Sequence, residues 1–464
     1  MRLKSLCNMA MGLVLLACTL PAGLAAQTSS ADTDQKVADL EKQLQAIRSE
    51  LDALKSQSAA PAAAATAATP AATAATPAAT SAVAAAPANP LAGITSVLGG
   101  VNLTGLVDAY YGYNANHPAL GPANVGNTAT EPFQFTNSQF SLNLLELQLD
   151  KPVDKTSPLG FRVALGFGQA ITAVNNTSFE VAKTSTGVQE YLKEGYMSYM
   201  APIGKGLQID AGKFVTPAGA EVIETNQNWN YSRSLLFTYA IPYYHFGARA
   251  KYTFNDKWSV TGYVTNGWNN VVATNTGKTF GPSIAWNATK KVTITENYLT
   301  GPRDILGTGN NGPWNHLSDT VIAYNPTTKL SLQANVDYDH QAQYPTTNSS
   351  ADYTGIAAYA KYAFNPNVAV AGRYEYFNDH DGLATTPGAI NPALVGEGQH
   401  LNEFTGTIER KFAGHLISRL EYRHDQSNKN FFERGHGLGP NGFTNGQDTV
   451  DVGLMFVLEP SDTK

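Results

Sequence analysis

Beyond residue 100 the chain is built from segments of roughly 9 to 13 residues in which apolar and polar side chains alternate, which is the length of a tilted strand that crosses a bilayer. In the segment 328–340, Leu332 and Val336 fall on one face, and Gln333 and Asp337 fall on the other. A period of two residues is typical of a β-strand with one apolar and one polar face. The sequence therefore predicts membrane-spanning strands that face lipid on one side and an aqueous lumen on the other.

About sixteen such segments can be placed, and an even number is what a closed barrel with both chain ends on one side of the membrane requires. The alternation breaks near Leu144 and Leu145, where we expect a bulge. The predicted strands are 102–113, 137–150, 159–170, 190–201, 206–214, 243–254, 257–266, 278–287, 290–300, 316–325, 328–340, 352–364, 367–379, 401–412, 414–425 and 448–458.

The connections between these segments are alternately short and long. Tight turns at 255–257, 325–327, 365–367 and 413–414 follow even-numbered strands, and long connections follow odd-numbered ones. Outer-membrane barrels have short periplasmic turns and longer external loops, so this alternation predicts a periplasmic N-terminus. A soluble β-sandwich is the alternative, but it does not combine so many strands of this length with such regular connections. The predicted fold is an all-β transmembrane barrel over residues 100–458.

The composition agrees with a barrel in a membrane. Charged residues make up 15% of the chain, against about 25% in soluble domains. The 22 Tyr and 19 Phe suit aromatic girdles at the ends of membrane strands. The 31 basic and 37 acidic residues leave a net charge of -6 with no basic tract, so we expect no nucleic-acid partner.

Residues 1–26 have the pattern of a secretory signal peptide. Basic residues open the segment, an apolar run follows at 9–20, and small residues follow at 21–26. The run is shorter than the roughly 20 residues that a membrane-spanning helix needs. We expect cleavage after Ala25 or Ala26 and export from the cytoplasm.

Both cysteines, Cys7 and Cys18, lie inside this segment, so the mature chain is expected to carry no thiol chemistry. Residues 15–18 also resemble a lipoprotein box, in which Cys18 would be acylated and become the new N-terminus. The bulky Leu16 disfavours this alternative, because such boxes prefer a smaller residue there.

Residues 33–57 predict a short coiled coil, because apolar residues recur at alternating spacings of three and four. The seam consists of Val37, Leu40, Leu44, Ile47, Leu51 and Leu54. Residues 58–95 are almost wholly Ala, Thr and Pro, a composition that predicts a disordered, extended linker. At about 3.1 Å per residue the linker could reach on the order of 100 Å. We expect a periplasmic coiled coil that self-associates and that can reach the peptidoglycan.

Three stretches resemble the OmpL-like porins, a family of bacterial outer-membrane β-barrels. They are VNLTGLVDAYYGYNANHP at 101–118, GPSIAWN at 281–287 and the long stretch LKEGYMSYMAPIGKGLQIDAGKFVTPAGAEVIETNQNWNYSRSLLFTYAIPYYHFGARAKYTFNDKWSVTGYVTNGWNN at 192–270. The resemblance covers most of residues 100–458 and is more specific in the first half. It implies a porin without identifying the solute, and analogy with other porins favours a homotrimer. The sequence departs from many outer-membrane barrels in that Phe456 is not the terminal residue.

The longest connection runs from 215 to 242, after the fifth predicted strand. In general porins the loop after the fifth strand folds into the lumen, so we predict that this one forms the pore constriction. The alternative is an external loop that packs near the trimer axis. The residues expected to narrow the pore are Glu221, Glu224, Trp229, Tyr231 and Arg233.

Charged residues at inward-facing strand positions are predicted to line the pore and to impose a transverse field on passing solutes. They are Arg249, Lys251, Arg373, Glu375, Arg419, Glu421 and Arg423. The alternative is that most of them only pair with neighbours across strands.

His415, His424 and His436 lie near Asp425, but their spacing follows no compact ligand pattern, so we expect no metal. The chain has no nucleophile elbow, metalloprotease helix or phosphate-binding loop, so we expect neither catalytic residues nor a cofactor. The predicted function is passive diffusion of small hydrophilic solutes or ions across the bacterial outer membrane. The alternative is a structural anchor that ties the membrane to the cell wall through the coiled coil. A gated importer is disfavoured, because the linker stands where such importers carry a plug domain.

Overall fold

The computed structural model describes residues 42, 45, 100–118, 133, 138–176, 187–273, 275–303, 310–343, 349–385, 391–412, 414–435 and 442–459. The chain separates into two units, Met1–Pro87 and Ala88–Lys464. In the first unit only Lys42 and Gln45, both helical, belong to the described residues. The predicted signal peptide, the coiled-coil seam and the linker therefore lie outside the described residues.

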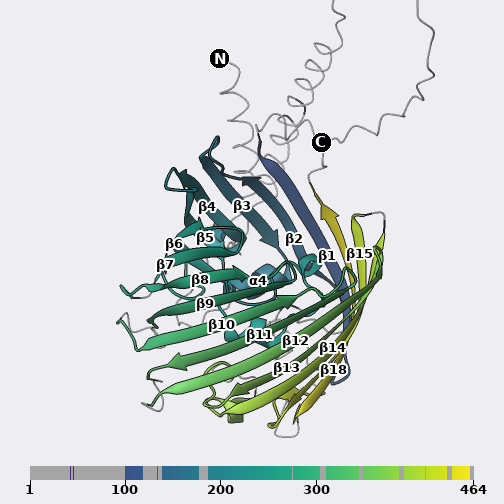
Figure 1. Ribbon diagram of the computed structural model, residues 1–464. Helices are drawn as coiled ribbons and strands as arrows, with labels where there is room; N and C mark the ends of the chain where they lie inside the picture. The colour runs from purple at the N-terminus through teal and green to yellow at the C-terminus, as the bar shows by residue number, and fades with distance from the viewer. Residues whose placement is uncertain are drawn as a thin grey trace, which may run out of the picture. The chain divides into compact units, whose positions relative to one another are not determined.

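Within the described part of the second unit, 16 antiparallel strands form one closed barrel, as predicted (Figure 1). Each strand pairs with its neighbours in the sequence, and the last strand pairs with the first to close the ring. The strands are β1 (Asn102–Asn114), β2 (Gln139–Lys151), β3 (Leu159–Phe167), β4 (Leu192–Ala201), β5 (Leu207–Val215), β6 (Tyr244–Thr253), β7 (Trp258–Thr265), β8 (Thr279–Asn287), β9 (Val292–Pro302), β10 (Trp314–Tyr324), β11 (Leu330–Gln341), β12 (Ala351–Asn365), β13 (Val368–Asp379), β14 (Gln399–Phe412), β15 (Leu416–Ser427) and β18 (Gly446–Leu458).

The remaining elements are short and lie in the connections between barrel strands. They are α4 (Gln169–Asn176), η1 (Gly187–Glu190), η2 (Thr225–Gln227), the π-helical turn η3 (Leu236–Ala240), η4 (Pro392–Leu394) and a small hairpin of β16 (Phe432–Glu433) and β17 (Phe443–Thr444). Among the described residues, no helix is both long enough and apolar enough to cross a membrane.

The alternation in the sequence corresponds to two faces of the barrel wall. On β11, Val336 is 43% exposed and Tyr338 is 45% exposed, whereas Asp337 and Asp339 are buried inside the barrel. Apolar side chains face outward and polar side chains face inward because lipid is the outer solvent. The polar interior is therefore where the functional residues lie.

Aromatic side chains gather towards both ends of the wall. Trp258 and Trp286 stack with ring centroids 5.2 Å apart at one end of β7 and β8. Phe280 and Trp314 pack edge to face at 5.6 Å towards the other end. Outer-membrane barrels place such girdles at the two lipid–water interfaces.

Short turns lie at one end of the barrel, here called the turn end, and long connections lie at the other, the loop end. In the turn between β6 and β7, the Asn255 side-chain oxygen accepts the backbone N–H groups of Lys257 and Trp258 at 2.9 and 3.0 Å. Asn365 does the same between β12 and β13. Such side-chain oxygens replace a backbone acceptor and allow a tight reversal.

The bulge expected near Leu144 is present. Asp108 on β1 lies opposite Leu144, and the next residue of β1 lies opposite Leu142, so Asn143 is the extra residue. Its side chain points into the barrel and donates to Asp108 at 2.7 Å. The bulge thus turns an additional polar group inward.

One predicted strand end is wrong, because the chain forms a helix where the strand was expected to continue. The strand expected to run to residue 170 ends at Phe167, and Gly168, with φ 113, reverses the chain into α4. Ile171 and Val174 on this helix are buried, and a Cβ at Gly166 would lie 2.4 Å from Cγ1 of Ile171. The helix packs against β2 and β3 because its apolar residues recur at helical spacing, a pattern that the strand assignment overlooked.

Candidate pore constriction

The connection between β5 and β6 lies inside the barrel, where its backbone contacts inward-facing side chains of several strands (Figure 1). We call residues 216–243 the constriction loop. Its apolar side chains Ile223, Leu235, Leu236 and Ile241 are buried and belong to one hydrophobic cluster with residues of the barrel wall such as Phe377. The Ser234 hydroxyl accepts the Phe237 N–H at 2.9 Å and so satisfies one of the free donors at the start of η3.

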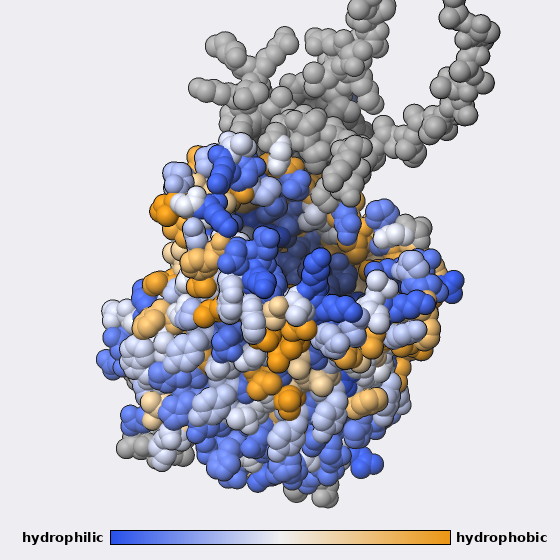
Figure 2. All heavy atoms as spheres, in the orientation of Figure 1, coloured by the Kyte–Doolittle hydropathy of each residue, from blue (hydrophilic) through white to orange (hydrophobic). Residues whose placement is uncertain are grey.

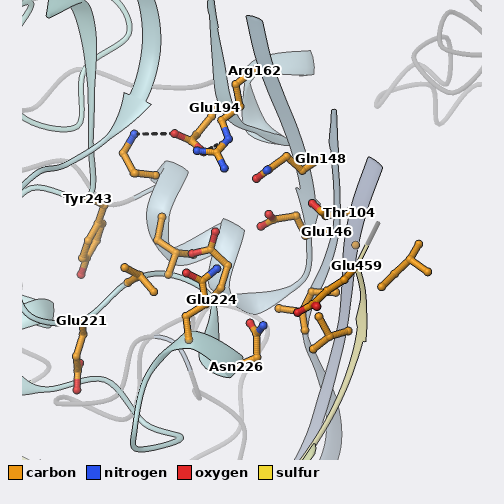
Figure 3. Close-up of a pocket in the computed structure, with 18 of the residues that line it drawn as sticks. Thr104, Glu146, Gln148, Arg162, Glu194, Glu221, Glu224, Asn226, Tyr243 and Glu459 are labelled. Atoms are coloured by element: carbon orange, nitrogen blue, oxygen red, sulfur yellow. Dashed lines mark hydrogen bonds and ion pairs between the residues drawn. The ribbon is translucent and has the colours of Figure 1, made fainter. Parts of the chain in front are cut away.

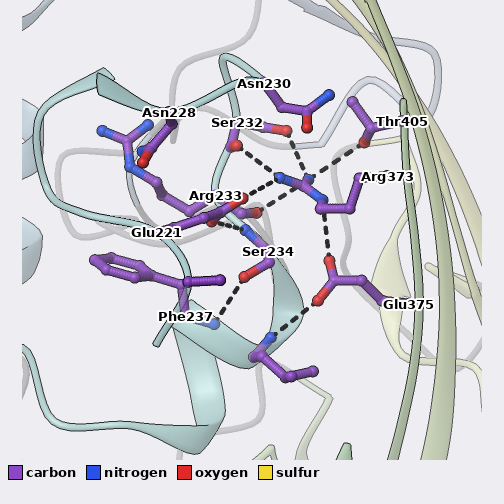
Figure 4. Close-up of polar contacts among 12 residues, drawn as sticks. Glu221, Asn228, Asn230, Ser232, Arg233, Ser234, Phe237, Arg373, Glu375 and Thr405 are labelled. Atoms are coloured by element: carbon purple, nitrogen blue, oxygen red, sulfur yellow. Dashed lines mark hydrogen bonds and ion pairs between the residues drawn. The ribbon is translucent and has the colours of Figure 1, made fainter. Parts of the chain in front are cut away.

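Carboxylates on β13 and β15 accept backbone N–H groups of the loop. Glu375 on β13 accepts those of Leu235 and Leu236 at 2.8 and 3.1 Å (Figure 4). Glu421 on β15 accepts that of Ser232 at 2.7 Å. Both glutamates are buried, so they satisfy backbone N–H groups of the loop that would otherwise lack a partner inside the barrel.

Three arginines on the same two strands, β13 and β15, donate to backbone carbonyls of the loop. Arg373 on β13 donates to the Ser232 carbonyl at 2.9 Å, as Figure 4 shows. Arg423 on β15 donates to the Arg233 carbonyl at 2.6 Å. Arg419, also on β15, donates to the carbonyls of Thr225, Asn228 and Asn230 at 2.7, 2.6 and 2.9 Å. The wall thus satisfies polar groups that an irregular buried segment would otherwise leave unpaired.

Strands β10 and β11 hold the start of the loop. Asp319 on β10 accepts the Gly219 N–H at 3.0 Å, and Asn335 on β11 accepts the Ala220 N–H at 2.9 Å. Gly219 has φ +95, a conformation that a residue with a Cβ rarely adopts. The start of the loop is therefore fastened to β10 and β11, and its later part to β13 and β15.

The five residues predicted to narrow the pore all belong to this loop, but they do different things. Glu221 accepts the Ser234 N–H at 2.7 Å and pairs with Arg373 at 2.8 Å. Trp229 is half-buried and meets the Tyr359 ring edge to face at 6.4 Å. Both residues border a cavity of about 180 Å³ beside β10, β11 and β12.

Tyr231 and Arg233 are buried and shape the loop. The Tyr231 hydroxyl donates to Asp108 on β1 at 2.7 Å. Arg233 donates to the carbonyls of Val222 and Tyr231 at 3.1 and 2.7 Å, and its guanidinium lies 5.3 Å from the centre of the Phe133 ring. Neither side chain is open to solvent in this structure.

Glu224 ties the loop to the wall on the side of β2 and β4. It contacts Lys193, whose ammonium also lies 2.7 Å from Glu146. Burial acts to raise the pKa of Glu224, but the neighbouring Lys193 ammonium outweighs this and holds the pKa below its usual value.

The residues predicted to line the pore all point into the barrel. Five of them contact the loop or the charges that surround it, and each is at most 2% exposed: Arg373, Glu375, Arg419, Glu421 and Arg423. Arg249, on β6, instead pairs with Asp210 at 2.8 Å and lies 4.6 Å from the centre of the Phe214 ring. Lys251 follows on the same face and is exposed. In this structure most of the inward charges fasten the loop and do not face open water.

Several functional residues were not singled out from the sequence. Lys193, Glu146 and Asp108 lie at inward positions, yet their partners come from distant parts of the chain. The only sequence signal was a charged residue on the inward face of a predicted strand. That signal also marks many residues that pair locally.

A cavity of about 380 Å³ lies at the turn end between the loop and the wall (Figure 3). Glu146, Gln148, Arg162 and Glu194 line it from the wall, and residues 221–227 line it from the loop. Figure 2 shows hydrophilic side chains around a hollow at this end of the barrel. Within the described ranges, no three His, Cys, Asp or Glu side chains gather in a group that could hold a metal ion.

A closed barrel of 16 strands, with an apolar outside, a polar inside and a loop across its lumen, defines an outer-membrane β-barrel of the porin class. The family model described as "Putative beta-barrel porin-2, OmpL-like" matches residues 100–457. The chain belongs to this family, which confirms the resemblance seen in the sequence.

Several solved structures are similar. The outer membrane channel DcaP of Acinetobacter baumannii has a TM-score of 0.49 at 12% identity, over 77% of this chain and 97% of that chain. OmpT of Vibrio cholerae has a TM-score of 0.49 at 10% identity, over 77% and 97%. The anion-selective porin from Comamonas acidovorans has a TM-score of 0.48 at 10% identity, over 77% and 99%. No curated protein sequence matches this chain.

Proposed function

We propose that this protein is a passive channel that lets small hydrophilic solutes or ions diffuse across the outer membrane. The observation that carries the proposal is the constriction loop, whose backbone binds inward-facing side chains of several strands inside a polar barrel. A loop of this kind sets a size limit and presents fixed charges to a passing solute. The channel needs neither a cofactor nor a chemical step.

Within this proposal, Glu221, Glu224 and Trp229 narrow the passage for solutes, and Tyr231 and Arg233 keep the loop in shape. The inward charges Arg249, Lys251, Arg373, Glu375, Arg419, Glu421 and Arg423 act as the charged wall and as the fastenings of the loop. The support for these roles is the contacts between loop and wall and the two cavities beside the loop.

The proposed topology places the turn end in the periplasm and the loop end outside the cell, with outer-membrane lipid around the wall. We further propose a homotrimer, export by the signal peptide 1–26, and a periplasmic coiled coil at 33–57 on the linker 58–95. The coiled coil would clamp the trimer or reach the peptidoglycan. The spacing of the apolar seam and the alternation of short and long connections support this arrangement.

Single-channel recording in a planar bilayer tests the channel function. Stepwise, ohmic conductance from the purified full-length protein, in threefold multiples for a trimer, is the expected result. Electrophoresis of heated and unheated samples provides the control, because a folded barrel migrates differently from its unfolded chain. A folded barrel that produces no conductance steps would contradict the proposal.

One observation favours a second function. The loop packs so tightly on β13 and β15 that Arg373, Glu375 and Arg419 are almost fully buried. A closed lumen would leave the barrel as an anchor that ties the outer membrane to the cell wall through the periplasmic segment. Absence of conductance, together with retention of the full-length protein on isolated peptidoglycan, would favour the anchor.

A further inference from the structure

The cavity of about 180 Å³ beside β10, β11 and β12 differs in its lining from the larger one at the turn end. Carboxamides and aromatic rings dominate its lining, and we call it the amide cavity. They belong to Gln227, Asn228, Asn325, Gln333, Trp229 and Tyr359. Both the constriction loop and the wall contribute, so the cavity lies where a solute that passes the loop would touch both.

The strand register brings the wall residues of the amide cavity together. Gln333 on β11 lies opposite Ala323 on β10 and opposite Tyr359 on β12, so these three residues form one row across the wall. Neighbouring strands are about 4.8 Å apart, so the row spans about 10 Å. Ala323 carries only a methyl group, which leaves room for a ligand beside the carboxamide of Gln333.

The loop side of the amide cavity is held in place by bonds around Trp229. Arg419 donates to the carbonyls of Asn228 and Asn230 at 2.6 and 2.9 Å, on either side of Trp229 in the chain. The Asn228 side chain accepts the Val222 N–H at 2.9 Å and donates to the Val222 carbonyl at 2.8 Å. Because this backbone is already fixed, a ligand that packs against Trp229 orders little additional structure.

The charges at the amide cavity disfavour an ionic ligand. Among the described residues that line it, Glu221 is the only one with a carboxylate, and none is basic. The Glu221 carboxylate already lies 2.8 Å from Arg373 and accepts the Ser234 N–H at 2.7 Å. An anion would therefore meet no cation in the lining, and an ammonium group would compete with Arg373 for Glu221.

A buried hydroxyl at the amide cavity provides independent support for a polar ligand. Tyr359 is 5% exposed, and its ring meets that of Trp229 edge to face with centroids 6.4 Å apart. Its hydroxyl makes no hydrogen bond of normal geometry with any residue that the structure describes. A buried hydroxyl without a partner is unfavourable, so a ligand that hydrogen-bonds to it gains affinity.

We propose that the amide cavity binds one ring of a neutral sugar on its way through the channel. The inference rests on the proposed channel function and names its solute class. The C–H face of a pyranose ring is apolar and packs on aromatic rings such as Trp229. Its hydroxyls both donate and accept hydrogen bonds, as the carboxamides of Gln333 and Asn325 do. A cavity of roughly 150 Å³ holds a benzene ring, so the amide cavity has room for one six-membered ring.

Saturation-transfer NMR on the folded full-length protein tests the proposal, with methyl glucoside as the probe. Lauryldimethylamine oxide serves as the detergent, because it has no sugar head group that would compete. Succinate and choline are the charged probes, and we expect stronger transfer to the glucoside than to either. Gln333→Leu removes a carboxamide at nearly constant volume and should lower the transfer by about threefold or more. Asn325→Ala, in an exposed turn where the wall is not disturbed, should lower it in the same direction.

Gln426→Leu is the matched control for these variants. Gln426 lies at the loop end of β15, next to the buried Asp425, so it faces the outside of the barrel. The same chemical change there should leave the transfer unaltered.

Transfer that is no stronger to the glucoside than to succinate or choline would overturn the sugar site and leave the channel function intact. The same holds if neither cavity variant lowers the transfer relative to Gln426→Leu. Single-channel recording on the same preparation separates the two proposals. Specific transfer to the glucoside from a folded barrel without conductance would uphold the site and overturn the channel function.

Discussion

The guanidinium of Arg373 on β13 lies 2.8 Å from the carboxylate of Glu221 in the constriction loop, across 152 residues of sequence. The same guanidinium pairs with Glu403 on β14 at 3.0 Å and with Glu375 at 3.1 Å. All four side chains are buried, so one cation balances several carboxylates at the point where the loop meets the wall.

Removing this cation should release the loop. Arg373→Met leaves its carboxylate partners buried without their cation. Breaking a buried ion pair in this way lowers the free energy of unfolding by about 3–5 kcal/mol. We expect a lower midpoint of unfolding in urea and a larger, noisier single-channel conductance. Arg410→Met is the control, because Arg410 lies on β14 at the turn end and its guanidinium lies 4.8 Å from the centre of the Phe412 ring. Equal conductance in both variants would contradict the role of Arg373 as a fastening.

A glycine on β18 makes room for the loop. A Cβ at Gly453 would lie 2.2 Å from the Tyr231 ring, so Gly453→Val should push this ring away from the wall and destabilise the barrel by roughly 1–3 kcal/mol. Chemical unfolding followed by tryptophan fluorescence measures the change. Gly406→Val on β14 is the control, because a Cβ there meets nothing within 4 Å. If both variants unfold at the same denaturant concentration, the Tyr231 ring does not depend on this space.

The predicted coiled coil can be tested by deletion. In a variant whose signal peptide is joined directly to residue 91, the barrel is kept and the seam from Val37 to Leu54 is removed. If the protein forms the proposed trimer, we expect the deletion variant's trimer to dissociate at a lower temperature than the full-length one on semi-native gels, because linked helices raise the local concentration of the barrels. A deletion trimer that resists heat as well as the full-length trimer would exclude the clamp.

His380, in the connection after β13, should titrate above its ordinary pKa. Its Nδ1 lies 2.9 Å from Asp381, and this hydrogen bond to the carboxylate, aided by its charge, raises the pKa of His380 above 6.5. Because the pKa of His380 is higher in the folded than in the unfolded protein, protonated His380 stabilises the folded connection at pH values below 6.5. This stabilisation is lost as the pH rises through the pKa of the folded state. Proton NMR of the imidazole ring measures the pKa of His380, and Asp381→Asn should lower it towards its ordinary value, because Asp381 is the larger of its two acidic neighbours in effect. An identical titration in both proteins would show that Asp381 does not act on His380.

The strands of the barrel could be predicted from the sequence because the alternation of apolar and polar residues that defines each strand lies within that strand. Alternation such as that of Val336 and Asp337 is set by the contrast between lipid and the interior, so each strand reveals its two faces by itself. The break in this alternation near Leu144 and Leu145 predicted the bulge for the same reason, and the strand register places the extra residue at Asn143. The strand assigned up to residue 170 failed where Gly168 lets the chain turn into a short helix.

The contacts inside the barrel depended on the tertiary structure. The sequence alone indicated that Arg373, Glu375 and Glu421 point inward, but not that they bind the backbone of the constriction loop. Lys193 and its two glutamates come from three separate segments, so no local pattern could join them. Periodicity determines which side of a strand is polar, whereas closure of the barrel decides which polar groups meet, because ion pairing depends on distance in space and not on distance along the chain.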